Sequence, residues 1–343
     1  MTKGLGIIIS SALLLLAGCS GEDALEPPVA GTPLQVEAAM GNLTRTALTT
    51  NDNFSAFSLW GFDGSGAVFA DGTAFTKEMT TGTWGSSASL VWPLSGNCDF
   101  YGAAPSGVSL DTSTRSFAYT CPAADNATQQ DVLVASKLAA SKTDNNGKVE
   151  LSFNHALSFV RFKSSNTLDG FNIEISEVRL CNLVADGTFT FSETSESTGS
   201  WTLGNTTDNY TVAPAEPVSL TSADAYIDDA DGVLMVMPQT PTAWDPTTDG
   251  RATASTKCYL EVACKVSTSA STPYYYVGSA SVYGKLYFPF SRELKQNTRH
   301  TFRLTFGGYD ENGQEVLSAV QVLPGIAARV AAWITEDEEE LVM

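Results

Sequence analysis

The sequence predicts an all-β protein made of two tandem antiparallel β-sandwich domains, and three observations lead to this fold class. Thr, Ser, Gly, Ala, Val and aromatic residues dominate, while Glu, Lys and Leu at helical spacing are scarce. Segments with apolar residues at every second position recur along the chain and are separated by turn-forming residues. About three hundred residues follow residue 45, which is enough for two domains of ordinary size.

The first nineteen residues are predicted to be a lipoprotein signal peptide. Lys3 supplies a weakly positive start, and residues 5–18 form an apolar core that is too short to span a bilayer. This core ends in the letters LAGC, which form a bacterial lipobox. We therefore expect cleavage before Cys19, and lipidation of Cys19 by diacylglycerol and an acyl chain such as palmitate. The alternative is an ordinary secretory signal followed by a chance cysteine.

Residues 20–45 divide into a tether and a strand. The tether, SGEDALEPPVAGTP, is polar, acidic and rich in Pro and Gly, so it should be flexible. Its acidic residues Glu22 and Asp23 resemble the surface-export signal of Bacteroidetes lipoproteins. From residue 33 the pattern alternates, and one face of the predicted strand carries Leu34, Val36, Ala38 and Met40.

Arg45 follows this strand, five residues beyond Met40. It precedes Thr46 in a run of small polar residues without Pro, which suits a trypsin-like protease. The alternative interpretation is an exposed linker arginine without a function. A strand that should anchor a sheet is thus followed directly by a candidate site of proteolytic cleavage.

We expect the first sandwich over residues 46–167. Alternation and turn signals place its strands at 54–62, 87–94, 99–105, 131–140 and 148–165. Asn146-Gly147 is a strong hairpin signal before the last of these strands. The polar stretch 164–170 is the best candidate for the boundary between the domains.

The second sandwich is expected over residues 168–343. Its predicted strands cover 171–183, 233–240, 258–266, 273–284, 284–290 and 298–309. The run 233–240 is continuously apolar, which is typical of a strand that is buried on both faces. Asn312-Gly313 then leads into 315–325, and the last segment alternates around Val330 and Ala332.

Charge and cysteine content narrow the range of partners and chemistry. With 19 basic and 38 acidic side chains, the protein would repel nucleic acid and anionic lipid, so we expect neither as a partner. We interpret most cysteines beyond Cys19 as small buried hydrophobic residues, because no spacing resembles a zinc site. Their number is odd and the sequence does not reveal a disulfide pairing for Cys98, Cys121, Cys181, Cys258 and Cys264.

No constellation of residues indicates an enzyme. His155 and His300 are the only histidines, and neither has neighbours in the sequence of catalytic or metal-binding character. We therefore expect no catalytic residues, no metal and no cofactor. The aromatic run 273–279 is compatible with a sugar-binding platform, but alternating aromatic residues on a strand more often pack in a core.

Several segments, in their order and spacing, resemble the fimbrillins, the type V pilin superfamily of Bacteroidetes. These segments are 98–105 (CDFYGAAP), 131–136 (DVLVAS), 149–162 (VELSFNHALSFVRF), 177–191 (EVRLCNLVADGTFTF), 234–240 (LMVMPQT) and 330–337 (VAAWITED). The resemblance implies two transthyretin-like sandwiches and a subunit that is exported as a lipoprotein of the outer membrane. It also implies that an arginine-specific, trypsin-like protease removes the N-terminal segment, after which the freed groove accepts a C-terminal strand of the next subunit.

Physical chemistry explains why such an exchange is favourable. Removal of the strand up to residue 45 would uncover an apolar groove, and refilling the groove is worth roughly 5–8 kcal/mol. An open sheet edge favours addition of a strand from a neighbour, and head-to-tail addition propagates into a filament. Cleavage would also sever the subunit from its lipid. The donor strand is expected within about 315–335, in one of two segments whose alternating residues are Val316, Val320 and Val322, or Val330 and Ala332.

The resulting hypothesis is a structural subunit of surface fimbriae that supports cell adhesion. Its partners would be further copies of itself, tip and anchor subunits, and the arginine-specific protease. The contrasting hypothesis is a lipid-anchored surface protein, or a tip or anchor adhesin, that captures host or bacterial glycans or proteins and does not polymerise. The sequence leaves open the stalk, tip or anchor role, the adhesion target and the identity of the donor segment.

Overall fold

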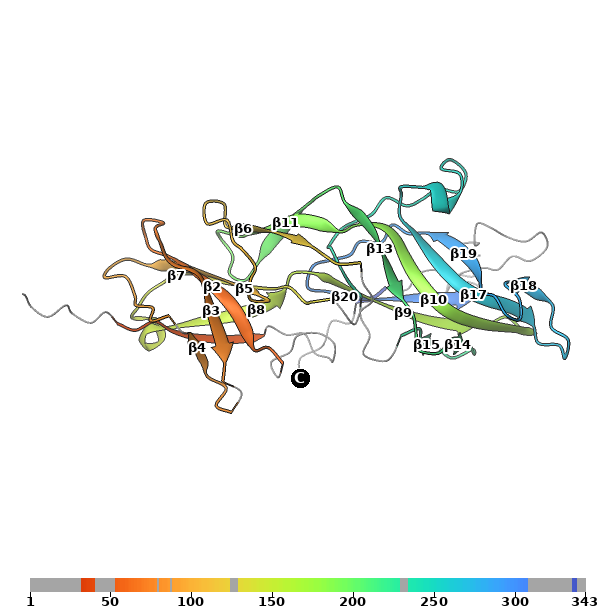
Figure 1. The fold of residues 1–343 in the computed structure, drawn as a ribbon, viewed down its shortest axis with the longest axis horizontal. Helices are drawn as coiled ribbons and strands as arrows, with labels where there is room; N and C mark the ends of the chain where they lie inside the picture. The colour runs from red at the N-terminus through yellow and green to blue at the C-terminus, as the bar shows by residue number, and fades with distance from the viewer. Residues whose placement is uncertain are drawn as a thin grey trace, which may run out of the picture. The chain divides into compact units, whose positions relative to one another are not determined.

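The computed structural model describes residues 32–40, 53–78, 80–86, 88–123, 129–228, 234–307 and 335–337. This part of the chain consists of β-strands, turns and two short 3-10 helices, η1 (Asp144–Gly147) and η2 (Ala252–Ala254), so the predicted all-β fold is confirmed (Figure 1). None of the helices in it is long and apolar enough to cross a membrane. The expected signal peptide, residues 1–19, lies outside the described residues.

A seven-stranded sheet forms most of the N-terminal half. In spatial order its strands are β1 (Gln35–Met40), β8 (Lys148–His155), β7 (Leu133–Ala140), β5 (Cys98–Ala104), β2 (Ala56–Phe62), β3 (Val68–Lys77) and β4 (Trp84–Ser86). Strands β1 and β8 run parallel, whereas the other neighbours in this sheet are antiparallel.

The sheet divides into two layers because β8 diverges from β7. These two strands pair over only two residues each. Beyond that point β8 passes over the face of β5, where a Cβ atom on Gly102 would lie 2.7 Å from the ring of Phe153. Glycine at this position allows the close approach. The pair β1–β8 therefore forms a layer of its own over β5 and β2.

A third layer covers the opposite face of β5 and β2. It consists of β6 (Ser116–Thr120), β11 (Asp186–Phe191) and β12 (Gly199–Leu203). The rings of Tyr101 in β5 and Phe191 in β11 meet with their centroids 5.1 Å apart. In β2, Phe57 and Leu59 belong to the core under β1–β8, whereas Phe62 belongs to the core shared with β11. Strand β2 is thus buried on both faces, which explains why its buried residues do not alternate.

The loop 192–198, between β11 and β12, fills the space between β7 and β8. The backbone N–H of Ser197 donates to Oγ of Ser136 at 2.7 Å, and the side-chain amide of Asn154 donates to the carbonyl oxygen of Ser197 at 3.0 Å. A carboxylate oxygen of Glu196 accepts a hydrogen bond from the backbone N–H of Leu138 at 3.1 Å. Polar groups of this loop take the place of a strand ladder, as buried backbone groups require.

The C-terminal half is a sandwich of two further sheets. One contains β15 (Ala225–Tyr226), β16 (Leu234–Val236), β9 (Ser158–Asn166), β20 (Arg299–Phe306) and β21 (Thr335–Asp337). The other contains β13 (Thr207–Val212), β10 (Phe171–Val184), β14 (Val218–Ser219), β17 (Tyr259–Thr268), β18 (Tyr275–Val277) and β19 (Gly284–Pro289). Alternate side chains from the two sheets meet in one core, among them Val160, Ile173, Val178, Leu260 and Phe302.

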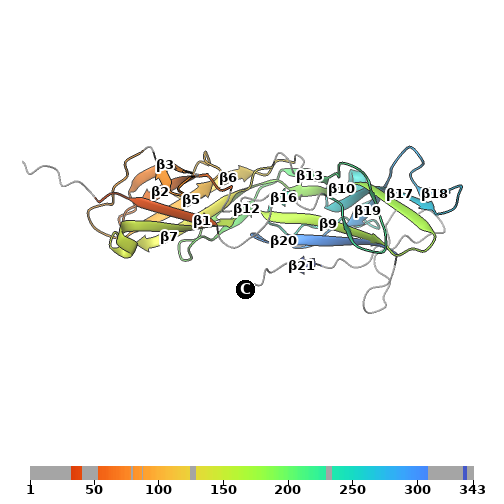
Figure 2. The same ribbon diagram turned by 90° about the horizontal axis from the view of Figure 1, so that it is seen from below.

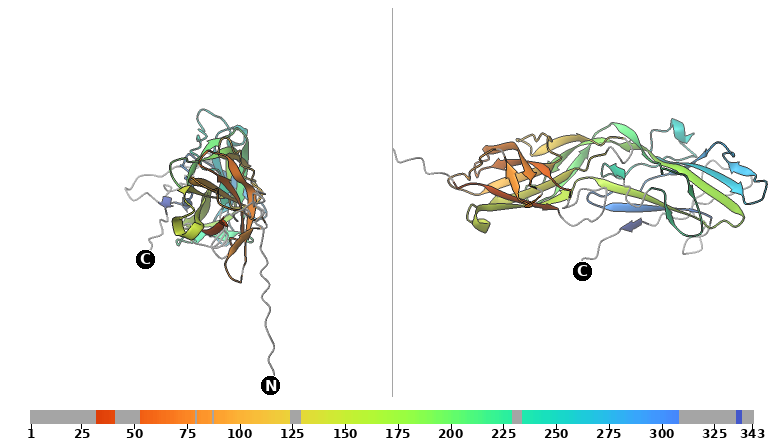
Figure 3. Two further views of the ribbon diagram at one scale, coloured as in Figure 1. Left: turned by 90° about the vertical axis from the view of Figure 1, so that its left-hand side faces the viewer. Right: turned by 60° about the horizontal axis from the view of Figure 1, so that its bottom comes forward.

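Strand β20 lies between β9 and β21, and its two neighbours run in opposite directions. It is parallel to β9 and antiparallel to β21. Figure 2 and the right-hand view of Figure 3 show β20, in blue, with β9 on one edge and β21 on the other. The C-terminal strand β21 is therefore an edge strand of its sheet.

Each half of the fold contains strands from the part of the sequence assigned to the other half. The boundary expected between residues 167 and 168 falls between β9 and β10, and both of these strands belong to the C-terminal sheets. Strands β11 and β12, from the expected second domain, pair with β6 of the first. The chain thus enters the C-terminal sheets with β9 and returns to the N-terminal half for residues 186–203.

Three local features differ in detail from the sequence prediction. The strand expected over 87–94 is a connection with one bridge, between Val91 and Pro33, because this segment bonds to the edge of β1. The strand expected over 273–284 is reduced to β18. Asn146 and Gly147 have the positive φ angles that a hairpin signal implies, 57° and 80°, but they end η1, since the strands on either side diverge.

The five cysteines beyond Cys19 are buried and free, which agrees with their interpretation as small hydrophobic residues. Burial raises the pKa of the Cys121 and Cys264 thiols to about 12, and the pKa of Cys181 to about 11. Thiolates, which are the reactive form of cysteine, are therefore strongly disfavoured in the folded protein.

We expect these five thiols to resist a thiol-specific reagent at about pH 8 in the folded protein and to react after unfolding. Because the folded thiols keep their protons to a higher pH than unfolded ones, the free energy of unfolding should fall as the pH rises above about 9. Reagent titration with and without denaturant, and urea unfolding from about pH 7 to pH 10, measure the two effects. Rapid labelling of any of the five in the folded protein would contradict the buried arrangement.

Candidate functional site

Strand β1 is an edge strand, and its side chains alternate between core and solvent. It pairs with β8 in parallel register along its whole length. Val36 and Met40 are buried, with 5% and 9% of their surface exposed, and Leu34 and Ala38 pack partly buried against the same core. The four side chains that the sequence assigns to one face of this strand therefore lie together against one hydrophobic core.

The core beneath β1 is rich in aromatic rings. Phe57 of β2 stacks on Phe75 of β3, with centroids 5.3 Å apart and planes at 7°. Phe153 of β8 meets Phe54 edge-on at 4.8 Å. Without β1, part of this apolar surface would contact water, at about 25 cal/mol for each Å² uncovered.

A second segment holds the edge of β1 that faces away from β8. We call residues 80–92 the strap; residue 87 within it is not described. In the strap, Trp84 Nε1 donates a hydrogen bond to the carbonyl oxygen of Ala38 at 2.8 Å. The backbone N–H of Leu34 donates to the carbonyl oxygen of Leu90 at 2.9 Å. Strand β1 thus has the ladder with β8 on one edge, and on the other edge the strap bonds Ala38 and Leu34, the residue just before the strand.

Trp92 fixes the strap to the rest of the layer. Its backbone N–H donates to the carbonyl oxygen of Thr32 at 3.0 Å, just before β1. Its indole Nε1 donates to the carbonyl oxygen of Gly147 at 2.9 Å, just before β8. Trp92 therefore bonds both the segment that precedes β1 and the segment that precedes β8.

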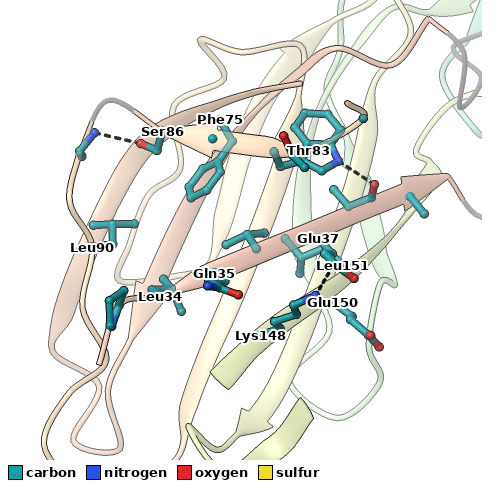
Figure 4. Close-up of a pocket in the computed structure, with 18 of the residues that line it drawn as sticks. Leu34, Gln35, Glu37, Phe75, Thr83, Ser86, Leu90, Lys148, Glu150 and Leu151 are labelled. Atoms are coloured by element: carbon teal, nitrogen blue, oxygen red, sulfur yellow. Dashed lines mark hydrogen bonds and ion pairs between the residues drawn. The ribbon is translucent and has the colours of Figure 1, made fainter. Parts of the chain in front are cut away.

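A cavity with a volume of about 1100 Å³ lies between β1 and the strap (Figure 4), and we call the apolar site that holds β1, together with this cavity, the groove. Phe75 projects into it from β3, and Leu90 lines it from the strap. Beside β1, Lys148 Nζ lies 2.5 Å from a carboxylate oxygen of Glu37, and this hydrogen bond raises the pKa of Lys148. An apolar floor next to a strand edge is a surface that accepts an extended peptide chain.

The remaining predicted site residues lie outside the described residues. They are Cys19, Arg45, Thr46, Val316, Val320, Val322, Val330 and Ala332. Close to the last of them, residues 335–337 form β21, which pairs with β20.

Both histidines are buried, and neither lines the groove. His155 Nδ1 lies 2.7 Å from a carboxylate oxygen of Asp131, and the backbone N–H of His155 donates to Asn297 Oδ1 at 3.2 Å. His300 Nε2 accepts a hydrogen bond from the backbone N–H of Lys295 at 2.9 Å. In the part of the chain that the structure describes, no group of three or more His, Cys, Asp or Glu side chains is arranged to hold a metal ion.

Of the aromatic run 273–279, one ring is exposed to solvent. Tyr274 has 64% of its surface exposed, whereas Tyr275 and Tyr276 are partly buried. The ring of Tyr276 packs on Phe171 of β10 with centroids 5.6 Å apart. Packing at a sheet edge thus accounts for Tyr276, whose ring also meets that of Tyr274 with centroids 4.9 Å apart.

Sequence reasoning missed the strap and the role of Trp84. The indole of Trp84 bonds a carbonyl group 46 residues earlier in the chain, and no local pattern marks such a contact. The nearest signal is the apolar alternation over 87–94, which predicts a regular strand. The structure instead has one bridge there, at Val91, and places Leu90 and Trp92 against the core.

Comparison with known proteins identifies the family. A family model described as fimbrillin-like matches residues 42–333. The chain belongs to the fimbrillin-like family. The matched region of this fimbrillin-like protein begins directly after β1 and contains all the other described strands except β21. Membership makes the protein a fimbrial subunit of the cell surface.

A solved structure of a fimbrial protein shares the fold of this fimbrillin-like protein. A fimbrial protein from Bacteroides vulgatus has a TM-score of 0.51 and 13% sequence identity, over 80% of this chain and 94% of that one. A candidate cell adhesion protein from Bacteroides ovatus has a TM-score of 0.45 and 16% identity, over 80% of this chain and 92% of that one. No curated protein matches the chain. At these identities the comparison concerns the fold alone.

Proposed function

We propose that this fimbrillin-like protein is a structural subunit of surface fimbriae that polymerises by exchanging β1 for a C-terminal strand of another copy. In this proposal the protein is exported as an outer-membrane lipoprotein acylated at Cys19, and an arginine-specific, trypsin-like protease cuts it after Arg45. The observation that carries the proposal is the placement of β1. It is an edge strand whose inner side chains complete a core, and the chain joins it to the body only through residues 41–52.

The position of Arg45 supports a single maturation cut. Arg45 is the only Lys or Arg between Lys3 and Lys77. A cut after it separates β1 and everything before it from a body that begins at Thr46 and keeps β2 to β21. The strand that completes the core over Phe57 and Phe153 would then no longer be covalently part of the body.

The inner face of β1 defines what a replacement strand must supply. Val36 is buried. Ala38 is a small residue, and its carbonyl oxygen accepts a hydrogen bond from the indole N–H of Trp84. In the orientation of β1, Val330 and Ala332 reproduce this valine–alanine spacing, whereas the segment with Val320 and Val322 would place a valine at the alanine position. Since overpacking a fixed site costs about 1–3 kcal/mol, we favour the segment around Val330 as the donor.

The proposal is tested by treating the purified protein with an arginine-specific protease, followed by N-terminal sequencing, intact mass and electrophoresis without heating. We expect a chain that begins at Thr46 and runs as a ladder of polymers. Arg45→Ala should remain uncut and monomeric. Arg45→Lys is the matched control, since it should resist the arginine-specific enzyme but be cut, and form ladders, with trypsin. A complete cut that yields only monomers would contradict polymerisation.

The alternative is a lipid-anchored surface adhesin, or a tip or anchor subunit, that captures glycans or proteins without polymerising. It predicts a chain that stays acylated at Cys19, uncut at Arg45 and monomeric in the same experiment. Among the described residues, Tyr274 is the one tyrosine with a largely exposed ring, which gives this alternative little surface for stacking on a sugar. We expect no enzymatic activity in either case.

A further inference from the structure

The strap and β8 hold β1 along its two edges, and none of the bonds involved needs residues 41–52. We infer that cutting the chain in 41–52 does not release β1: the cut subunit keeps its N-terminal segment bound in the groove until another strand displaces it. This inference rests on the proposed function, and it concerns the order of events after the cut. It modifies the expectation that cleavage by itself severs the subunit from its lipid.

The contacts that survive the cut are numerous for so short a strand. On one edge, the parallel ladder with β8 spans all six residues of β1. On the other edge, Trp84 and Leu90 of the strap bond the backbone of Ala38 and Leu34. On the inner face, Val36 belongs to a core of aromatic rings.

Unlike the covalent link that the cut removes, these contacts can break and form again. Each hydrogen bond and each buried apolar side chain contributes only a modest free energy, so a strand bound by several of them dissociates slowly but reversibly. The groove is also occupied by β1 at the moment of cutting. A free apolar groove, which would invite aggregation, is therefore not formed as an intermediate.

Retention of β1 couples the release of the subunit from its lipid to its entry into a polymer. If the cut alone released β1, the two events would be separate. The chain before β1 leads back to Cys19, the expected lipid attachment site. A cut subunit that keeps β1 stays tied to that anchor through the groove. It leaves the anchor only when a strand of another copy replaces β1, so release from the membrane and entry into a polymer become one step.

The test uses the full chain with an affinity tag inserted directly after Cys19, where it outlasts removal of the signal peptide, and with a recognition sequence for a sequence-specific protease inserted within 41–52. The inserted site makes the cut independent of Arg45. After complete cutting on the affinity resin, we expect the body to remain on the resin for hours through β1. A body that washes off as soon as the chain is cut would overturn the inference, while leaving exchange into an empty groove intact.

A synthetic peptide of residues 314–335 then tests the proposed function separately. Excess peptide should release the body from the resin at a rate that rises with peptide concentration. A body that is retained but never released by the peptide would support retention of β1 and contradict strand exchange.

Variants of the groove show whether the named contacts hold β1. Trp84→Phe keeps a ring but removes the donor to Ala38, and it should speed release of the cut body about fivefold. Val36→Asp should abolish retention. Ala39→Asp, on the exposed face of the same strand, is the matched control and should behave as the wild type. Equal release from all three variants would overturn the inference that these contacts retain the strand.

Discussion

Replacement of Phe153 by alanine is expected to lower the free energy of unfolding by about 3–5 kcal/mol. The ring is fully buried, and its centroid lies 4.8 Å from that of Phe54 and 5.0 Å from that of Phe57. It also sits on Gly102 of β5, where no side chain could fill the space that the ring leaves. The substitution therefore opens a cavity at the contact between the β1–β8 layer and the middle layer.

Urea unfolding followed by tryptophan fluorescence measures this effect. Ser152→Ala is the matched control, because Ser152 is the preceding residue of β8 and lies on its exposed face, so its replacement should change the free energy by less than about 0.5 kcal/mol. Phe153→Leu should cost less than Phe153→Ala, since it leaves a smaller cavity. A loss below about 1 kcal/mol for Phe153→Ala would contradict the layered arrangement.

Replacement of Asp131 by alanine is expected to cost about 3–5 kcal/mol. The carboxylate of Asp131 and the imidazole of His155 lie 2.7 Å apart, with 3% and 1% of their side-chain surfaces exposed. Removing the carboxylate leaves the buried imidazole without this polar neighbour. His155 is the last residue of β8, just before the chain passes to β9, and Asn297 binds its backbone N–H. The substitution therefore destabilises the region where the two halves of the fold meet.

Thermal unfolding of Asp131→Ala is best compared with two further variants. Asp131→Asn retains the shape of the side chain and an acceptor oxygen, so it should be less destabilising. Lys137→Ala breaks the ion pair between Lys137 and Glu196, whose side chains are 38% and 42% exposed, respectively. It should lower the free energy of unfolding by at most about 1 kcal/mol. If Asp131→Ala destabilises no more than Lys137→Ala, the buried pair is not a structural anchor.

Much of the strand content follows from local patterns, because the side-chain period of a strand is visible in the sequence. In β8, Val149, Leu151 and Phe153 face the core and the residues between them face solvent, as their alternation predicts. The apolar run that contains β16 is correctly predicted to be buried on both faces. The alternation in β1 likewise shows which of its side chains face inward.

Alternation does not reveal which strand lies next to which, and this is where prediction from the sequence ends. The parallel partner of β1 lies more than a hundred residues further along the chain, and nothing near Gln35 indicates a pairing with Lys148. The return of β11 and β12 to the N-terminal half depends on the fit of Phe189 and Phe191 to rings of other strands. Such contacts between distant residues also define the strap, so the far side of the groove was not predictable.

The middle layer, whose strands β2 and β5 have a separate hydrophobic core on each side, has a consequence for a subunit that loses its first strand. Among the described residues, side chains of β1 belong to only one of these cores. Departure of β1 would therefore admit water to one face of the middle layer and leave the other dry. The larger core, which also runs through the C-terminal sandwich, would continue to hold the chain in its native topology. An open groove and a folded body can thus coexist in one molecule.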